Sequence, residues 1–169
     1  DIGCGKGTLL DNVRQRFLSM GHFVEPLGIE VSPGMAAMAA EKFEQAGGQV
    51  IVASAMEGVS DLPDESVDLV VMSCFLEHEQ QPRRLLKNLH RVVTGDGAVI
   101  VKVPNFASWN RIVRGKKWCG FRYPDHVNYF TPRTLEMLAS ETDFRVERQN
   151  LNDKFPLSDN MYAVLKKCA

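Results

Sequence analysis

The feature that most constrains the fold is a glycine cluster at the start of the sequence, Asp1-Ile2-Gly3-Cys4-Gly5-Lys6-Gly7. Apolar residues at helical spacing follow it between Leu9 and Phe17, so the cluster opens a helix. A glycine turn that opens a helix is typical of α/β folds that bind a ligand through the N–H groups of the helix N-terminus. Such a turn normally follows a strand, which here would lie upstream of Asp1. We therefore expect an N-terminally truncated fragment whose first strand is missing.

Buried-strand patterns alternate with amphipathic-helix patterns along the following residues. Four short apolar runs are typical of strands covered on both faces: 27–29, 50–53, 67–73 and 98–103. Ser32-Pro33 is an N-cap with proline at the first helical position, and it predicts a helix that ends at Gly47-Gly48. A stripe from Leu85 to Val93 predicts another helix, which we expect Thr94-Gly95-Asp96-Gly97 to end. The alternation predicts a Rossmann-like, doubly wound α/β fold with a mostly parallel sheet and helices on both faces.

The remainder of the chain predicts an insertion and a sheet edge. Residues 106–131 interrupt the alternation, and Thr131-Pro132 then predicts a capped helix. Two candidate strands, 144–151 and 161–165, close the chain and predict an antiparallel C-terminal edge pair. We expect a single domain with three parts: a cofactor-binding core at 1–105, an insertion or lid at 106–131, and a C-terminal helix with edge strands at 132–169.

Composition excludes several classes of protein. Twenty Lys and Arg against 21 Asp and Glu give a net charge of −1, so the whole chain has no electrostatic preference for nucleic acid or acidic membranes. The longest apolar runs are far shorter than the ~20 residues that span a bilayer. The four cysteines form no CxxC pair, which disfavours a zinc site and a disulfide scaffold, and no His accompanies Cys4 at ligand spacing. We expect no metal, reduced thiols and a cytoplasmic protein.

The spacing of the glycines narrows the choice of ligand. A phosphate-binding loop needs Ser or Thr directly after its lysine, whereas Lys6 is followed by Gly7. A dinucleotide-binding turn has Gly or Ala three residues after its second glycine, where this chain has Thr8. The second difference weakens a nicotinamide-dependent oxidoreductase as an alternative but leaves it open.

The glycine cluster resembles the first motif of the class I S-adenosylmethionine-dependent methyltransferases, and Glu30 matches their acid at the end of the second strand. Later segments match in the same order: Leu62-Pro63 with 66–71, Cys74-Phe75-Leu76-Glu77-His78, and 91–93 with 95–97. The resemblance implies that Glu30 binds both ribose hydroxyls of S-adenosylmethionine, since one carboxylate offers two acceptor oxygens. It implies that Asp1 helps to hold the methionine end. It also implies cofactor contacts at Gly3, Cys4, Gly5, Gly7, Val31, Ser54, Ala55, Met56 and Ser73.

The chain departs from the family pattern after its third strand. Ser54 stands where the family often has an acid that receives the adenine amino group. Adenine is then expected to rely on backbone and apolar contacts. Glu57 is either a shifted substitute for that acid or a solvated turn carboxylate.

The stretch from Phe121 to Pro132 is similar to one in a small-molecule subgroup that resembles the quinone-biosynthesis O-methyltransferases. The similarity implies a small or lipid-like acceptor that is methylated on oxygen. His126 and His78 are the candidate catalytic residues, because imidazole can take a proton near neutral pH. Asp125 would raise the basicity of His126 if their side chains converge. In the alternative interpretation, His126 anchors the insertion and His78 bonds backbone at a strand-to-helix turn.

Residues 106–122 combine five Lys and Arg side chains with five large apolar ones and contain no acid. The segment is a lid over the acceptor, a patch that contacts a membrane surface, or a solvated insertion whose aromatic rings pack back onto the sheet. For the whole chain we expect a methyltransferase with a small-molecule acceptor and no nucleic-acid partner. A cofactor-binding or scaffolding fragment without turnover is the alternative outside the enzyme class.

Overall fold

The computed structural model describes residues 1–153 and 155–168, and the chain folds into two compact units, Asp1–Leu62 and Pro63–Ala169. Each unit has its own sheet, and both have the α/β character that the sequence predicts. No helix in the described ranges is long and apolar enough to cross a lipid bilayer.

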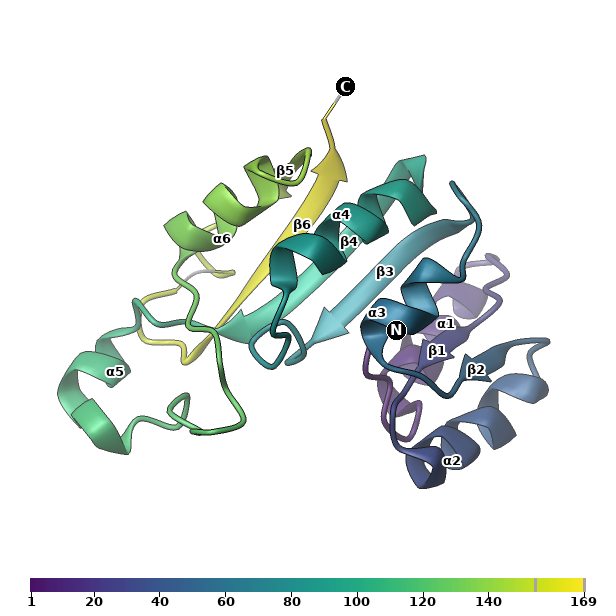
Figure 1. Ribbon diagram of the computed structural model, residues 1–169, viewed down its shortest axis with the longest axis horizontal. Helices are drawn as coiled ribbons and strands as arrows, with labels where there is room; N and C mark the ends of the chain where they lie inside the picture. The colour runs from purple at the N-terminus through teal and green to yellow at the C-terminus, as the bar shows by residue number, and fades with distance from the viewer. Residues whose placement is uncertain (154, 169) are drawn as a thin grey trace. The chain divides into compact units, whose positions relative to one another are not determined.

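The first unit is built on a parallel pair of short strands. Its elements in order are α1 (Thr8–Ser19), β1 (Leu27–Ile29), α2 (Pro33–Glu44), β2 (Gln49–Ile51) and α3 (Ala55–Ser60) (Figure 1). Leu27 pairs with Gln49 and Ile29 with Ile51, which brings the carboxyl ends of both strands to the same edge. Ile2 forms a parallel bridge with Ile29, so the residues before the glycine turn run beside β1 as a strand would.

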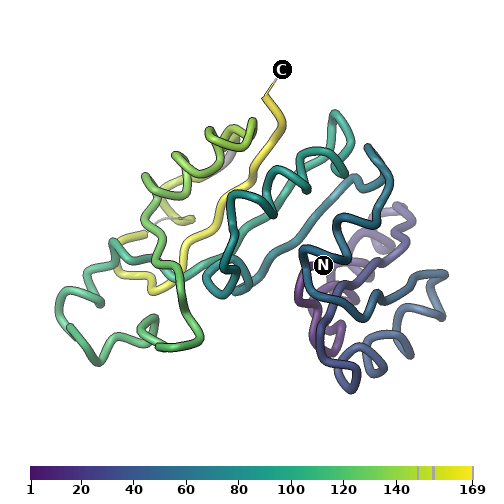
Figure 2. Tube along the Cα trace, viewed as in Figure 1, coloured from purple at the N-terminus to yellow at the C-terminus, as the bar shows by residue number. Residues whose placement is uncertain are grey.

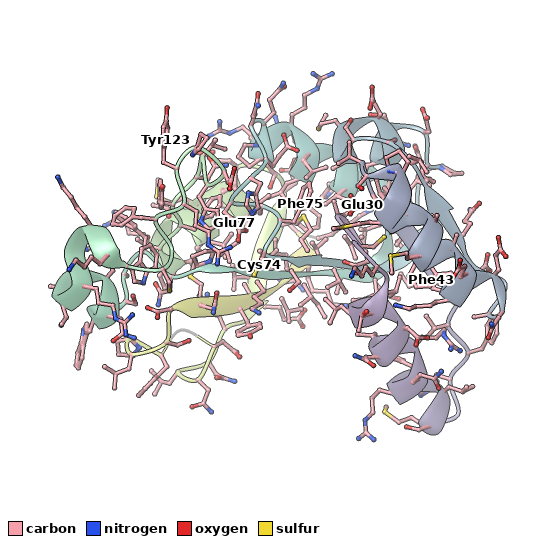
Figure 3. The ribbon with its side chains drawn as sticks, turned by 90° about the horizontal axis from the view of Figure 1, so that it is seen from below. Glu30, Phe43, Cys74, Phe75, Glu77 and Tyr123 are labelled. Atoms are coloured by element: carbon pink, nitrogen blue, oxygen red, sulfur yellow. The ribbon has the colours of Figure 1, made fainter. Side chains whose placement is uncertain are left out.

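The core of the first unit forms around Phe43 of α2, which is fully buried and is labelled in Figure 3. Cys4, Leu10 and Ala39 pack with it, and Val50 of β2 lies against this cluster. These contacts hold α1 and α2 against the strands, because each helix buries its apolar face there. The glycine turn therefore packs against this buried hydrophobic cluster.

The second unit contains a four-stranded sheet in the order β3-β4-β6-β5. Strands β3 (Val67–Ser73) and β4 (Val93–Pro104) are parallel, with α4 (Pro82–Val92) between them in the chain. Strands β5 (Phe144–Arg148) and β6 (Asn160–Lys167) are antiparallel to each other, and β6 is antiparallel to β4. The predicted antiparallel edge pair is confirmed. Helix α4 and helix α6 (Pro132–Ser140) lie on one face of this sheet (Figure 1).

Local sequence explains where the elements of the second unit begin. Helix α6 follows Thr131 in a capping box, in which the Thr131 and Thr134 side chains each accept from the other's backbone N–H. Helix α4 buries the apolar stripe Leu85, Leu86 and Leu89, as its spacing predicts. Helix α4 ends at Val92, before residues 94–97 as expected, but these residues belong to β4 instead of forming a separate turn. The pairing shifts between Val67 and Leu69, so this predicted turn becomes an irregularity in the ladder.

Residues 105–131 leave the carboxyl end of β4 and return to the start of α6 (Figure 2). They contain α5 (Trp109–Arg114) and a 3₁₀ turn at Gly115–Lys117. Because β3 and β4 are parallel, with Ser73 opposite Lys102, this excursion and the turn after β3 emerge at the same edge of the sheet. Ligands of parallel sheets bind at such carboxyl edges.

Candidate functional site

The three glycines of the opening turn all have left-handed backbones, with φ of 70° at Gly3, 54° at Gly5 and 73° at Gly7. Only glycine adopts this conformation without strain. A Cβ on Gly7 would lie 2.8 Å from the Phe43 ring, whereas the nearest atom to a Cβ on Gly5 is the Met35 sulfur at 4.0 Å. The missing side chain of Gly7 thus lets the turn pack closely against Phe43. At Gly5, the missing side chain leaves the backbone accessible.

Glu30 follows β1 and is only 9% exposed. Its Oε2 accepts from the Gly5 N–H at 2.9 Å, and its Oε1 accepts from the Ser32 N–H at 2.8 Å. Two backbone donors therefore fix the carboxylate beside the glycine turn. Each carboxylate oxygen can accept more than one hydrogen bond, so the group remains able to bind two adjacent hydroxyls. This arrangement fits the ribose of an adenosine cofactor.

The other predicted cofactor residues near this turn differ in what their side chains can do. The Asp1 backbone carbonyl accepts from the Ile29 N–H at 3.0 Å, which places Asp1 at the end of the strand-like segment. The Cys4 side chain is part of the buried cluster around Phe43, so a cofactor contact at Cys4 has to come from its backbone. Val31 is exposed directly after Glu30.

Ser54, Ala55 and Met56 form the N-terminal turn of α3 in the first unit. The Ser54 hydroxyl accepts from the Glu57 N–H, and the Glu57 carboxylate accepts from both the Ser54 N–H and hydroxyl. The Ser54 hydrogen bond lowers the pKa of Glu57. Glu57 is therefore a capping residue in a short helix that was not predicted, although Ser54-x-x-Glu57 is the sequence signature of a capping box.

In the second unit, Ser73 is the last residue of β3 and is half-buried. Cys74 follows with a φ of 56°, and its N–H donates to the Lys102 carbonyl at 2.8 Å. A left-handed backbone is uncommon for a residue other than glycine and costs free energy, so such residues concentrate at functional sites. This turn directs the chain into residues 75–78 at the carboxyl edge, where Figure 3 labels Cys74, Phe75 and Glu77.

Glu77 is the least expected group at this edge, because it is an acid with only 1% of its surface exposed. Neither carboxylate oxygen has a hydrogen-bond partner among the described residues. Burial raises the pKa of Glu77 above its ordinary value. An unsatisfied buried carboxylate is costly, so Glu77 is a candidate for binding a ligand or holding a proton. In the sequence, Glu77 stands out only as part of a motif, since its position after a strand does not reveal its burial.

His78 and His126 lie beside each other next to Glu77, with ring centroids 4.7 Å apart and planes at 85°. His78 Nδ1 is 2.9 Å from the Asp125 carbonyl oxygen, and His126 Nδ1 is 2.8 Å from that of Gly120. Burial lowers the pKa of His126, and this outweighs the opposing effects of the Gly120 carbonyl and Asp125. The structure thus brings both predicted catalytic histidines together. Asp125 raises the pKa of His126 as expected, but the effect of burial is larger.

The segment after His126 is tied to the turn after β3 by backbone hydrogen bonds. The Val127 and Asn128 N–H groups both donate to the Glu77 carbonyl, at 2.9 and 3.0 Å. The Asn128 side-chain amide donates to the carbonyls of Leu76 and Glu79, at 3.2 and 2.6 Å. Residues 49 or more apart in sequence are therefore held in one arrangement before any ligand binds.

The basic and aromatic residues of 106–122 divide into a packed part and an exposed part. Trp118 is buried, donates from Nε1 to Asp159 at 2.6 Å, and packs edge-on against Phe106. Trp109 on α5 is 57% exposed, and Tyr123, directly after the segment, is 91% exposed and points outward (Figure 3). The buried Trp118 is compatible with a solvated insertion, and the exposed apolar residues leave the lid and the membrane contact as predictions.

A groove of about 630 Å³ lies between α4 and α6 in the second unit. Its walls include Arg83 and Glu141, which form an ion pair, and Phe130. None of Glu77, His78 and His126 lines it. The buried acid and the two histidines therefore identify the candidate site better than the volume of this groove does.

A family model described as a methyltransferase domain matches residues 1–149, which is most of the chain. A comparison with curated proteins gave no match. The family match covers both the glycine turn with Glu30 and the region of Glu77, His78 and His126.

Solved structures share the fold. A SAM-dependent methyltransferase from Archaeoglobus fulgidus is 21% identical, with 99% of this chain and 84% of that chain covered at a TM-score of 0.71. A possible histamine N-methyltransferase from Thermotoga maritima is 21% identical, with 97% and 77% covered at 0.67. The mitomycin 7-O-methyltransferase is 16% identical, with 99% and 48% covered at 0.74. At these identities the likeness shows the fold alone. On the family match, the chain belongs to the methyltransferase-domain family, as a Rossmann-like methyltransferase whose cofactor is S-adenosylmethionine.

Proposed function

We propose that this protein transfers a methyl group from S-adenosylmethionine to a hydroxyl oxygen of a small-molecule acceptor. The observation that carries the choice of oxygen is the buried, unpartnered Glu77 carboxylate beside His78 and His126. A neutral hydroxyl must lose its proton when it is methylated, so a site for hydroxyl acceptors needs a group that takes this proton. A neutral amine attacks with its own lone pair and has less need of a base.

The glycine turn and Glu30 bind the cofactor in this proposal. The Glu30 carboxylate accepts hydrogen bonds from the two ribose hydroxyls. The Gly5 and Ser32 N–H groups, which already donate to this carboxylate, keep it oriented. The N–H groups at the start of α1 face the negative end of the bound methionine moiety. Val31, Ser54, Ala55, Met56 and Ser73 remain proposed cofactor contacts, as do Asp1 and the backbones of Gly3, Cys4 and Gly7.

Bound S-adenosylmethionine supplies an electrophilic methyl group on a sulfonium sulfur, which leaves as a neutral thioether. The acceptor oxygen forms the new bond to the methyl carbon and loses its proton. His126 is the proposed proton acceptor, because its Nδ1 faces a carbonyl oxygen and must carry the hydrogen. Its Nε2 then holds a free lone pair. Glu77 is placed to stabilise the imidazolium that results, since it is a buried acid next to the ring.

The acceptor class is tested by product analysis with a donor that carries an isotope-labelled methyl group. Catechols and other phenols are offered beside amines of similar size, and the labelled atom is located by mass spectrometry. We expect label on oxygen. Label only on nitrogen would overturn the oxygen proposal and keep methyl transfer. Cofactor binding without any product would favour the scaffolding alternative, and binding of a nicotinamide dinucleotide in place of S-adenosylhomocysteine would overturn the cofactor site.

The membrane contact and the cytoplasmic location are separate proposals. Exposed Trp109, Ile112 and Val113 on α5, next to Arg114, suit the interface of an anionic membrane. Nucleic acid is not the proposed acceptor, because the net charge of −1 provides no general attraction to phosphates.

A further inference from the structure

We propose that Glu77, His78 and His126 bind a divalent transition-metal ion in the second unit. Each residue offers one ligand atom, and the three atoms all lie within 4.8 Å of one another. Glu77 and His78 come from the turn after β3, and His126 comes from the excursion after β4. This proposal revises the expectation of no metal, which considered only the cysteines and residues close to them in sequence.

The hydrogen bonds of the two histidines fix the tautomer that a metal requires. Nδ1 of His78 faces the Asp125 carbonyl, and Nδ1 of His126 faces the Gly120 carbonyl. A carbonyl oxygen can only accept, so both Nδ1 atoms carry hydrogen and both Nε2 atoms present lone pairs. Metal-binding histidines commonly donate their other ring N–H to a backbone carbonyl or carboxylate in this way. Two neighbouring imidazoles with this second contact are already oriented as ligands.

Glu77 provides an independent observation that points to a ligand, although the charges of Lys102 and Arg122 act on it from beyond contact distance. Its side chain is 1% exposed, and both oxygens lack a hydrogen-bond partner among the described residues. No described Lys or Arg forms an ion pair with it at contact distance. A buried carboxylate is stable when it is paired or coordinates a metal. A cation between Glu77 and the two rings would satisfy the acid and both lone pairs together.

The site is held in place by contacts that do not depend on the ion. The Val127 and Asn128 N–H groups bond the Glu77 carbonyl, and the Asn128 amide bonds the carbonyls of Leu76 and Glu79. These bonds join the two segments that supply the ligands. Little rearrangement is then required on binding, which lowers the conformational cost and favours affinity.

The donor set indicates the kind of metal. Imidazole nitrogen suits Zn²⁺, Co²⁺, Fe²⁺ and Ni²⁺, whereas Mg²⁺ and Ca²⁺ prefer oxygen ligands alone. Three protein ligands leave at least one coordination position for a water or a ligand oxygen. If the proposed function is correct, an acceptor hydroxyl takes this position. The metal then lowers the pKa of that hydroxyl, and its proton passes to solvent instead of to His126. Metal binding itself does not depend on the proposed function.

The test is titration of the chelator-treated chain with Co²⁺, followed by visible absorption, and with Zn²⁺, followed by calorimetry. We expect one ion per chain and the absorption of Co²⁺ bound by nitrogen and oxygen. Glu77→Gln, His78→Asn and His126→Asn should each weaken binding at least ~10-fold. His22→Asn is the matched control, because His22 is an exposed histidine of the first unit, and it should bind like the unmodified chain.

Folding of each variant is checked by circular dichroism, and His78→Asn is informative even if the buried substitutions destabilise the chain, since His78 is exposed. No stoichiometric binding by the unmodified chain, or unchanged binding by well-folded His78→Asn, would overturn the proposal. A sulfur-to-cobalt charge-transfer band would also overturn it, because it would assign the ion to a cysteine such as Cys74. Methylation on oxygen by a chain that binds no metal would leave the proposed function intact and return His126 to the role of base.

Discussion

Replacing Gly7 by alanine separates the packing role of the glycine turn from its backbone strain. Gly7 has a φ of 73°, and the new Cβ would lie 2.8 Å from Phe43 Cζ and 3.0 Å from Ala39 Cβ. The left-handed conformation costs an L-residue about 1–2 kcal/mol. Loss of unfolded-state entropy returns about 0.4–1 kcal/mol. Crowding of a packed core adds about 1–3 kcal/mol. The free energy of unfolding should therefore fall by about 1–5 kcal/mol, with about 3 kcal/mol as the central value.

Gly21→Ala is the matched control, because Gly21 has a φ of 84° and no atom within 4 Å of the added Cβ. This substitution introduces the backbone strain of a left-handed alanine without crowding any neighbour. We therefore expect the free energy of unfolding to fall by about 1 kcal/mol. Gly5→Ala, with Met35 at 4.0 Å, should resemble Gly21→Ala in stability and bind S-adenosylhomocysteine more weakly. Urea denaturation followed by circular dichroism measures the three values. Equal losses in Gly7→Ala and Gly21→Ala would refute the claim that Phe43 limits the turn.

Three further predictions concern single side chains. Glu30→Ala should weaken S-adenosylhomocysteine binding by about 1–3 kcal/mol in calorimetry, since the ribose loses a charged acceptor; unchanged affinity would remove Glu30 from the cofactor site. Asp159→Ala should lower the free energy of unfolding by about 1–3 kcal/mol, because the buried Trp118 N–H loses its partner. Burial raises the pKa of Asp159, but hydrogen bonds led by that of Trp118 outweigh it and hold this pKa below its ordinary 3.8. The stabilisation is thus complete above about pH 4 and is lost as pH falls through the lower folded-state pKa; a variant that differs equally at pH 2 and pH 7 would contradict this. Trp109→Ala should reduce binding to anionic vesicles at low salt, measured by co-sedimentation; no binding by the unmodified chain would favour a lid or a solvated insertion.

The order of strands and helices could be predicted from the sequence because apolar periodicity reports burial directly. The strand β3 has the predicted bounds, and the helix α4 begins three residues before the predicted stripe and ends one residue before the end of that stripe. The sequence predicted a turn at residues 94–97, which belong to β4. A glycine-rich pattern is the same whether it follows a helix or forms an irregularity within a strand. Helix α3 was missed because it is a short helix with no long apolar stripe, although its capping box was visible.

The cofactor side of the site was more predictable than the acceptor side. Glu30 lies a fixed distance after a glycine turn and a strand, so a local pattern identifies it, and its contact with Gly5 agrees with this placement. Glu77 and His126 are 49 residues apart, and only the paired β3 and β4 strands bring them to one edge. Burial of an acid and the choice of histidine tautomer are tertiary properties. Sequence periodicity carries no information about them.

The most direct test of the account compares turnover and cofactor affinity in His126→Asn, because asparagine retains some hydrogen bonding but cannot act as a base or a strong metal ligand. Single-turnover methyl transfer to a phenolic acceptor is measured beside S-adenosylhomocysteine affinity and the melting temperature, with His22→Asn as the control. The account predicts a ~10²–10⁴-fold fall in the rate of transfer with cofactor affinity nearly unchanged. A stable His126→Asn variant that transfers methyl groups at the full rate would contradict it.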